Sequence, residues 1–215
     1  MDLVSSYIWR GIYLGGPSFQ PSVTMRAGNF TLGAWASVDF VASSYKEVDL
    51  QVRYQWKGLT FQVSDLYDEG STSNRDVLTS RNYFHFGADS PHRVEAGVAW
   101  QVSRKVPVTL SWYTILFGAS DVDTEGRRCY SSYAEVSYPF AVKTIEMRAG
   151  VGVAPWKTAG VNGAKGFAVK NVFLTAGRDW SFRNMGSFRL GLFTQLAWCP
   201  FKEDVNLVGG VSLRM

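Results

Sequence analysis

The dominant feature of the sequence is an alternation of apolar and polar positions that recurs almost from one end to the other. In "KEVDLQVRYQW", residues 46–56, every second side chain is valine, leucine, tyrosine or tryptophan, and charged or amide side chains lie between them. Because successive side chains of a β-strand point to opposite faces, this pattern predicts a strand with one apolar and one polar face. The alternation predicts about twelve such strands, in the ranges 2–13, 18–27, 30–41, 46–56, 59–68, 91–103, 106–118, 129–138, 142–154, 167–178, 186–198 and 204–215.

The predicted connections alternate between short turns and longer loops. Short turns are expected around Gly28-Asn29, Lys57-Gly58, 103–105, 139–141 and 179–184, and the other connections at 14–17, 42–45, 69–90, 119–128, 155–166 and 199–203. An even number of strands joined in this way is typical of a transmembrane β-barrel with both termini at the short-turn end. The sequence therefore predicts an all-β fold, a transmembrane antiparallel up-and-down β-barrel formed by residues 1–215 as one domain. A β-sandwich would give the same alternation, although its strands are usually shorter.

Large aromatic side chains lie towards the ends of the predicted strands, as expected for the two girdles at the interfaces of a membrane. Tyr13, Phe40, Tyr67, Trp156 and Trp198 lie near the longer loops, and Trp56, Trp100, Tyr138, Trp180 and Phe182 lie near the short turns. We therefore expect the apolar faces to contact lipid and the polar faces to line a lumen.

An arginine stands in the middle of the first predicted strand, within "SSYIWRGIYL". The alternation predicts that Leu3, Ser5, Tyr7 and Trp9 face lipid, and that Asp2, Ser6 and Arg10 face the lumen. An arginine on the lipid face at mid-depth costs about 2–4 kcal/mol, which favours the inward orientation. Asp39, at a similar depth on another strand, is the expected partner of Arg10.

The charges predicted to line the lumen are nearly balanced in sign. They are Arg10, Arg26, Asp39, Glu47, Asp49, Arg53, Arg93, Glu95, Glu135, Glu146, Arg148, Arg189 and Arg214. A pore that selects strongly for one sign of ion would be biased towards the opposite charge. Two hypotheses stay open: a porin-like channel for passive passage of small polar or charged solutes, and a non-conducting barrel with a salt-bridged interior that presents its loops for adhesion or interaction.

Composition removes several other classes of protein. The net charge of +4 comes without any lysine- or arginine-rich block, so nucleic acid is not an expected partner. No stretch of about 18 apolar residues is present, so a transmembrane helix is not expected. Met1 leads directly into the first predicted strand without a recognisable signal peptide. Cys129 and Cys199 lack metal-binding spacing, and whether they form a disulfide stays open.

The N-terminal segments "VSSYIWRG", "QPSV" and "GAWAS" resemble the beginning of the TorF family of porin-like bacterial outer-membrane proteins, over about the first forty residues. The matching positions are Ser5, Tyr7, Arg10, Gly11, Gly33 and Trp35. The resemblance implies an outer-membrane barrel with no established substrate. Its expected partners are outer-membrane lipid and lipopolysaccharide, small polar solutes and, during biogenesis, the barrel-assembly machinery. The chain departs from the usual terminal aromatic residue of such barrels, because it ends in Met215.

Catalytic and metal-binding motifs are weak. His85 and His92 lie in or beside the 69–90 loop, near Ser71, Ser73, Ser80 and Ser90, where a rim-located hydrolase would need a serine–histidine pair. Asp121, Asp123 and Glu125 could approach a calcium ion, but they lack the spacing of an EF-hand. We therefore predict no enzymatic activity, no metal and no cofactor.

Overall fold

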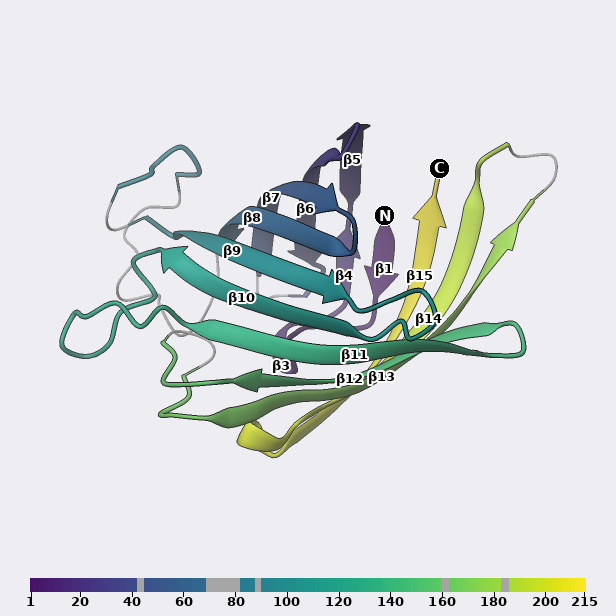
Figure 1. The fold of residues 1–215 in the computed structure, drawn as a ribbon. Helices are drawn as coiled ribbons and strands as arrows, with labels where there is room; N and C mark the ends of the chain where they lie inside the picture. The colour runs from purple at the N-terminus through teal and green to yellow at the C-terminus, as the bar shows by residue number, and fades with distance from the viewer. Residues whose placement is uncertain (42–44, 69–81, 88–89, 160–162, 183–185) are drawn as a thin grey trace.

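In the computed structural model, each alternating segment pairs with the next one along the chain, and the strands close into an antiparallel β-barrel (Figure 1). The structure describes residues 1–41, 45–68, 82–87, 90–159, 163–182 and 186–215. The wall has twelve strands when β4 and β5 are counted as one, because both pair with β6 in one register on either side of Pro21. The ring closes at β1, which pairs with β15 on one side and β4 on the other.

The strands follow one another with few other elements between them. They are β1 (Asp2–Val4), β2 (Tyr7–Trp9), β3 (Ile12–Gly15), β4 (Ser18–Gln20), β5 (Ser22–Ala27), β6 (Phe30–Asp39), β7 (Lys46–Trp56), β8 (Leu59–Asp68), β9 (His92–Gln101), β10 (Thr109–Phe117), β11 (Ser132–Val142), β12 (Ile145–Ala154), β13 (Ala168–Ser181), β14 (Arg189–Cys199) and β15 (Asp204–Arg214). A 3₁₀ turn, η2 (Pro200–Lys202), precedes β15. Within the described ranges, no helix is long and apolar enough to cross a membrane.

The outer face of the wall is apolar and exposed. Leu32, Val52 and Val63 lie side by side on β6, β7 and β8, and they are 53%, 45% and 51% exposed. The next row along these strands consists of Thr31, Arg53 and Gln62, which point into the barrel. The β-sandwich alternative is therefore wrong, because a sandwich would bury its apolar faces against each other.

Both chain termini lie at one end of the barrel, together with the short turns (Figure 1). We call this end the short-turn end, and the opposite end the long-loop end. The turn expected at 139–141 is wrong, since β11 continues and the turn falls at Lys143-Thr144. Pro139 pairs with Arg148 of β12 beyond the last residue pair of β10 and β11, so its missing N–H removes no bond on that side.

The first predicted strand divides into two parts with different positions. Residues 2–4 belong to the wall, whereas β2 and β3 form a hairpin inside the ring of strands, which we call the lumen hairpin (Tyr7–Gly15). Its turn is Arg10-Gly11, with φ angles of +51° and +81°, as a two-residue type I′ turn requires. The expected lipid-facing orientation of Tyr7 and Trp9 is therefore wrong.

Exposed aromatic side chains lie near both ends of the wall. Trp56, Trp100, Tyr138 and Phe182 are exposed at the short-turn end, and Phe40, Trp156 and Trp198 at the long-loop end. Tyr13 is also exposed, but it belongs to β3 of the lumen hairpin, so its expected place in the girdle of the wall is wrong. Tyr67 is a second exception, because it is only 3% exposed and packs against the rings of Tyr83 and His92. Its expected place in the long-loop girdle is wrong, since residues of the following loop cover it.

Candidate functional site

The lumen hairpin crosses the inside of the barrel near the long-loop end. The ring of Tyr7 packs against Trp35 of β6 and against Tyr45, with centroids 5.3 and 5.8 Å away. At the other end of the hairpin, the backbone of Gly11 lies against the carbonyl of Lys170 in β13. The hairpin therefore bridges opposite sides of the wall.

The connection from the hairpin back to the wall is fixed by Asp39. One carboxylate oxygen of Asp39 accepts a hydrogen bond from the backbone N–H of Gly16 at 2.9 Å, and the other accepts one from Val41 at 2.7 Å. Asp39 thus holds the base of the hairpin against the end of β6. The predicted ion pair between Asp39 and Arg10 is wrong, because the hairpin carries Arg10 away to the other side of the lumen.

Arg10 forms a buried ion pair with Glu95 of β9. Its two terminal nitrogens donate to the two carboxylate oxygens at 2.7 and 2.9 Å, and the side chains are 13% and 5% exposed. The guanidinium also lies 4.5–4.7 Å from the ring centroids of Trp9, Tyr113 and Tyr133. A two-pronged pair within an aromatic cage is a strong, directional anchor for the hairpin turn.

The aromatic cage is itself held by the wall. Tyr133 lies over Gly152 of the neighbouring strand, where a Cβ atom would overlap the phenol ring. The Tyr133 hydroxyl donates to Glu135 at 2.7 Å, and Glu135 also accepts a hydrogen bond from Arg148. The polar chain that starts at the hairpin turn therefore continues through β11 to β12.

A second polar cluster lies between the base of the hairpin and the wall. Tyr45 donates its hydroxyl hydrogen to buried Glu47 at 2.7 Å, and Arg93 pairs with Asp68 on the adjacent strand. One carboxylate oxygen of Asp49 is buried there without a hydrogen-bond partner. These contacts fill the long-loop half of the lumen around the hairpin.

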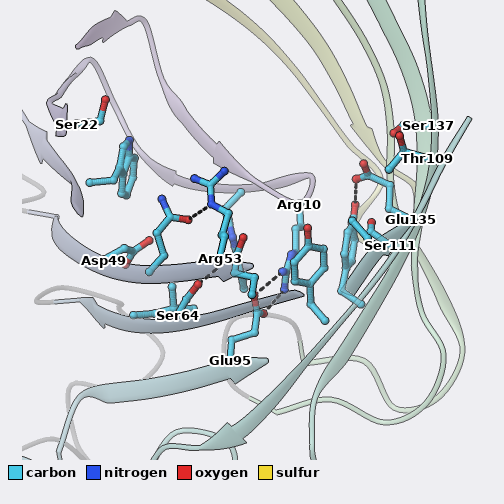
Figure 2. A pocket seen from close by; sticks show the side chains of 18 of the residues that line it. Arg10, Ser22, Asp49, Arg53, Ser64, Glu95, Thr109, Ser111, Glu135 and Ser137 are labelled. Atoms are coloured by element: carbon cyan, nitrogen blue, oxygen red, sulfur yellow. Dashed lines mark hydrogen bonds and ion pairs between the residues drawn. The ribbon is translucent and has the colours of Figure 1, made fainter. Parts of the chain in front are cut away.

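The short-turn half of the lumen is hollow. A cavity of about 760 Å³, which we call the main cavity, is lined by the Arg10–Glu95 pair and extends from it towards the short-turn end (Figure 2). Its walls carry hydroxyl, amide, aromatic and charged groups, from Trp9, Arg10, Ser22, Thr24, Trp35, Asp49, Gln51, Arg53, Gln62, Ser64, Glu95, Thr109, Ser111, Tyr113, Tyr133, Glu135, Ser137 and Arg148 among others. A second hollow of about 710 Å³ between β11 and β1 shares Pro139 and Arg148 with it.

The predicted lumen charges divide into three groups by position. Arg10, Asp49, Arg53, Glu95, Glu135 and Arg148 line the main cavity, and Glu146, Arg148 and Arg214 line the second hollow. Asp39, Glu47 and Arg93 pack around the hairpin, while Arg26 and Arg189 are exposed near the short-turn end. Their role in solute passage stays a prediction.

Sequence reasoning missed several residues of the site. Tyr113 and Tyr133 could have been found by the alternation that places Ser111 and Glu135 inward on the same strands. Trp9 gave no such signal, because its position depends on the hairpin leaving the wall.

Among the described residues, the ring of His92 does not pair with a serine. His92 contacts Asp65 through Nδ1 at 2.9 Å and the carbonyl of Tyr83 through Nε2 at 2.6 Å. The hydroxyl of Ser90 accepts from the backbone N–H of His92 and does not contact its ring nitrogens. Ser71, Ser73 and Ser80 lie outside the described residues, and the absence of enzymatic activity stays a prediction.

The acidic loop between β10 and β11 is held together by its own hydrogen bonds. Asp123 accepts from the backbone N–H groups of Glu125 and Arg127 and from Lys157. The Arg127 N–H in particular lowers the pKa of Asp123 below its usual range. Burial raises the pKa of the neighbouring Asp121. The described residues contain no group of three or more His, Cys, Asp or Glu side chains placed to hold a metal ion, and both Cys129 and Cys199 are free thiols.

We expect Asp123→Ala to loosen this loop and to speed tryptic cleavage after Arg127 at neutral pH. Because the pKa of Asp123 is lowered by folding, its stabilising contribution is present above the unfolded value of about 3.9 and is lost as the pH falls through the folded value. Glu125→Ala is the matched control, since it also removes an ion pair with Arg127, but one in which both side chains are largely exposed, at 68% and 65%. Equal cleavage of the two variants would contradict the assignment.

Comparisons with known proteins give no family for the chain. No protein-family model matches it, and no curated protein is similar to it in sequence. The fold defines an antiparallel twelve-strand β-barrel, a form compatible with an outer-membrane protein. The resemblance of the N-terminal segments to the TorF family stays a prediction.

Proposed function

We propose that the protein is an outer-membrane β-barrel that passes small polar or charged solutes through a lumen controlled by the hairpin at Tyr7–Gly15. The observation that carries this proposal is a cavity of about 760 Å³ lined by polar groups inside a wall whose outer face is apolar. Water-filled polar interiors with apolar, lipid-facing exteriors are the pattern of outer-membrane barrels. Outer-membrane lipid and lipopolysaccharide would then surround the wall, and the barrel-assembly machinery would insert it.

The direction of the proposed passage follows from the position of the hairpin. In outer-membrane barrels the short turns face the periplasm and the long loops face outside. The main cavity would therefore open to the periplasm, and the hairpin would separate it from the exterior. Passage requires the hairpin to move, and the Arg10–Glu95 pair is the contact that holds its turn in place.

A non-conducting scaffold is the second candidate, favoured by the packing at the long-loop end. Tyr7, Ile12 and Tyr45 are buried there, and Glu47 and Arg93 have carboxylate or hydroxyl partners. Such packing would make a permanent seal if the hairpin never left it.

A liposome swelling assay distinguishes the two candidates. Protein refolded into lipid vesicles should admit small polar solutes such as glycine or arabinose and exclude large oligosaccharides. The refolded protein should also show heat-modifiable migration on gels, as membrane barrels do. The scaffold would be supported, and the channel contradicted, if both the wild-type chain and a chain lacking the hairpin gave the swelling rate of protein-free vesicles.

A further inference from the structure

Two arginines on one side of the lumen have glutamine side chains as partners, whereas most other lumenal arginines pair with carboxylates. Arg53 donates from Nε to the side-chain oxygen of Gln51 at 3.2 Å, and Arg26 donates to that of Gln55 at 3.2 Å. By contrast, carboxylates hold Arg10, Arg93, Arg148 and Arg214. Amide partners leave the positive charge of a guanidinium uncompensated.

The register of the strands places these two charges at one depth. Thr31 of β6 pairs with Arg26 on one side and with Arg53 on the other, so the two Cα atoms are roughly 10 Å apart across two strand spacings. Gln62 lies on the far side of Arg53. Both neighbours of Arg53 across the strands, Thr31 and Gln62, are thus neutral. No carboxylate at this depth of β5 to β8 offsets the charges of Arg26 and Arg53.

The free edge of the Arg53 guanidinium points into the main cavity (Figure 2). Gln51 contacts Nε, and the two terminal nitrogens are directed away from it into the open space. Two parallel N–H groups of this kind match two oxygens of a carboxylate or a phosphate group in a two-pronged pair.

The wall opposite Arg53 is rich in hydroxyl groups, and its two charged residues, Glu135 and Arg148, are paired with each other. Thr109 and Ser111 of β10 and Ser137 of β11 line that side of the main cavity (Figure 2). Serine and threonine hydroxyls both donate and accept hydrogen bonds, which suits the hydroxyls of a polar solute.

The carboxylates of the main cavity do not cancel the charge of Arg53. Glu95 is paired with Arg10, and Glu135 is paired with Arg148. Asp49 lies on the same strand as Arg53 but four residues nearer the long-loop end, about 13 Å away at the rise of a strand. The short-turn side of the cavity therefore combines net positive charge with hydroxyl groups.

We propose that the main cavity is a binding site for small hydroxylated carboxylates, such as sugar acids and hydroxy acids. The carboxylate binds the fork of Arg53, with Arg26 as a second positive charge, and the solute hydroxyls bind the serine and threonine hydroxyls of β10 and β11. This inference rests on the proposed function, because it names the class of solute that the lumen selects. A volume of about 760 Å³ is in the range of small-molecule sites and accommodates a six-carbon acid.

The test is calorimetric titration of the refolded full chain in detergent at low salt, with gluconate, glucose and sulfate as probes. Gluconate is expected to bind at least about tenfold more tightly than neutral glucose, because only gluconate carries the charge that Arg53 pairs with. Arg53→Gln should weaken gluconate binding by about tenfold or more, Arg53→Lys by less, and Arg26→Gln by less than Arg53→Gln. Lys105→Gln, an equal charge change in an exposed turn outside the lumen, is the control and should leave binding unchanged.

Equal affinities for gluconate and glucose, or an Arg53→Gln variant that binds gluconate normally, would overturn the inference. Sulfate binding as tight as gluconate binding would overturn the part played by the hydroxyl wall. The titration does not need solute passage, so the two proposals can fail separately. Gluconate binding without vesicle swelling would contradict the channel alone, and swelling without gluconate binding would contradict this site alone.

Discussion

Glu95→Ala is expected to release the lumen hairpin while the barrel wall stays folded. The substitution leaves the Arg10 guanidinium in its aromatic cage without a counter-charge, since Glu95 supplies both acceptors. Removing one partner of a buried ion pair costs about 3–5 kcal/mol. That corresponds to a shift of roughly 10²- to 10⁴-fold in the ratio of docked to released hairpin.

Trypsin measures this release directly, because it cleaves after Arg10 only when the turn is accessible. The Glu95→Ala variant should lose the first ten residues rapidly in detergent, whereas the wild-type chain should keep them. Glu146→Ala is the control, since Glu146 lines the second hollow away from the hairpin. The double variant Arg10→Met with Glu95→Leu should recover part of the lost stability in thermal unfolding, because no charge is left buried and unpaired. Equal protection of Arg10 in the wild-type and Glu95→Ala chains would contradict the anchoring role of this pair.

Gly11→Ala should also undock the hairpin, through a different cause. Gly11 has a φ of +81°, and a Cβ atom there would overlap the carbonyl oxygen of Lys170 in the opposite wall. The strained backbone and the lost contact together should destabilise the docked state by about 1–3 kcal/mol.

Gly28→Ala separates the effect of the strained backbone from the effect of the lost contact with β13. Gly28 also has a positive φ, +57°, but no atom lies within 4 Å of the position that its Cβ would take. Thermal loss of the folded gel form and tryptic cleavage after Arg10 should both be faster for Gly11→Ala than for Gly28→Ala. If the two variants behave alike, the tip of the hairpin does not depend on contact with β13.

Most of the wall could be predicted from the alternation alone. The ranges 46–56 and 59–68 coincide with β7 and β8, because charged side chains between apolar ones fix both the strand and its inward face. The same argument predicts the orientation of Glu95 and Arg53. Where the alternation is weaker, as around Pro139, the predicted turn is displaced by a few residues.

The lumen hairpin could not be predicted in this way. The alternation continues through Tyr7 and Trp9, and it does not indicate whether a strand stays in the wall or folds into the lumen. The turn residues Arg10-Gly11 differ from the Asn-Gly or Asp-Gly pairs that mark most type I′ turns. The partner of Arg10 is 85 residues away, so a pairing with Glu95 depends on closure of the whole barrel.

Five of the six positions that carry the resemblance to the TorF family lie in or next to this hairpin. Tyr7, Arg10 and Gly11 belong to it, and Trp35 packs against Tyr7. Ser5 exchanges hydrogen bonds with the backbone of Gly209 in β15 just before the chain leaves the wall. We therefore expect that chains with the same pattern place a hairpin in the same part of their lumen.

The most direct test of the central claim is the single-channel conductance of a chain without the hairpin. Val4 and Ser18 pair across β1 and β4, so residues 6–16 can be replaced by Asn-Gly, which joins the two strands through a tight turn. In planar bilayers the wild-type chain should be closed most of the time, and the shortened chain should give a steady open current. A shortened chain that folds, inserts and carries no current would contradict the account of a polar lumen closed by its own N-terminal hairpin.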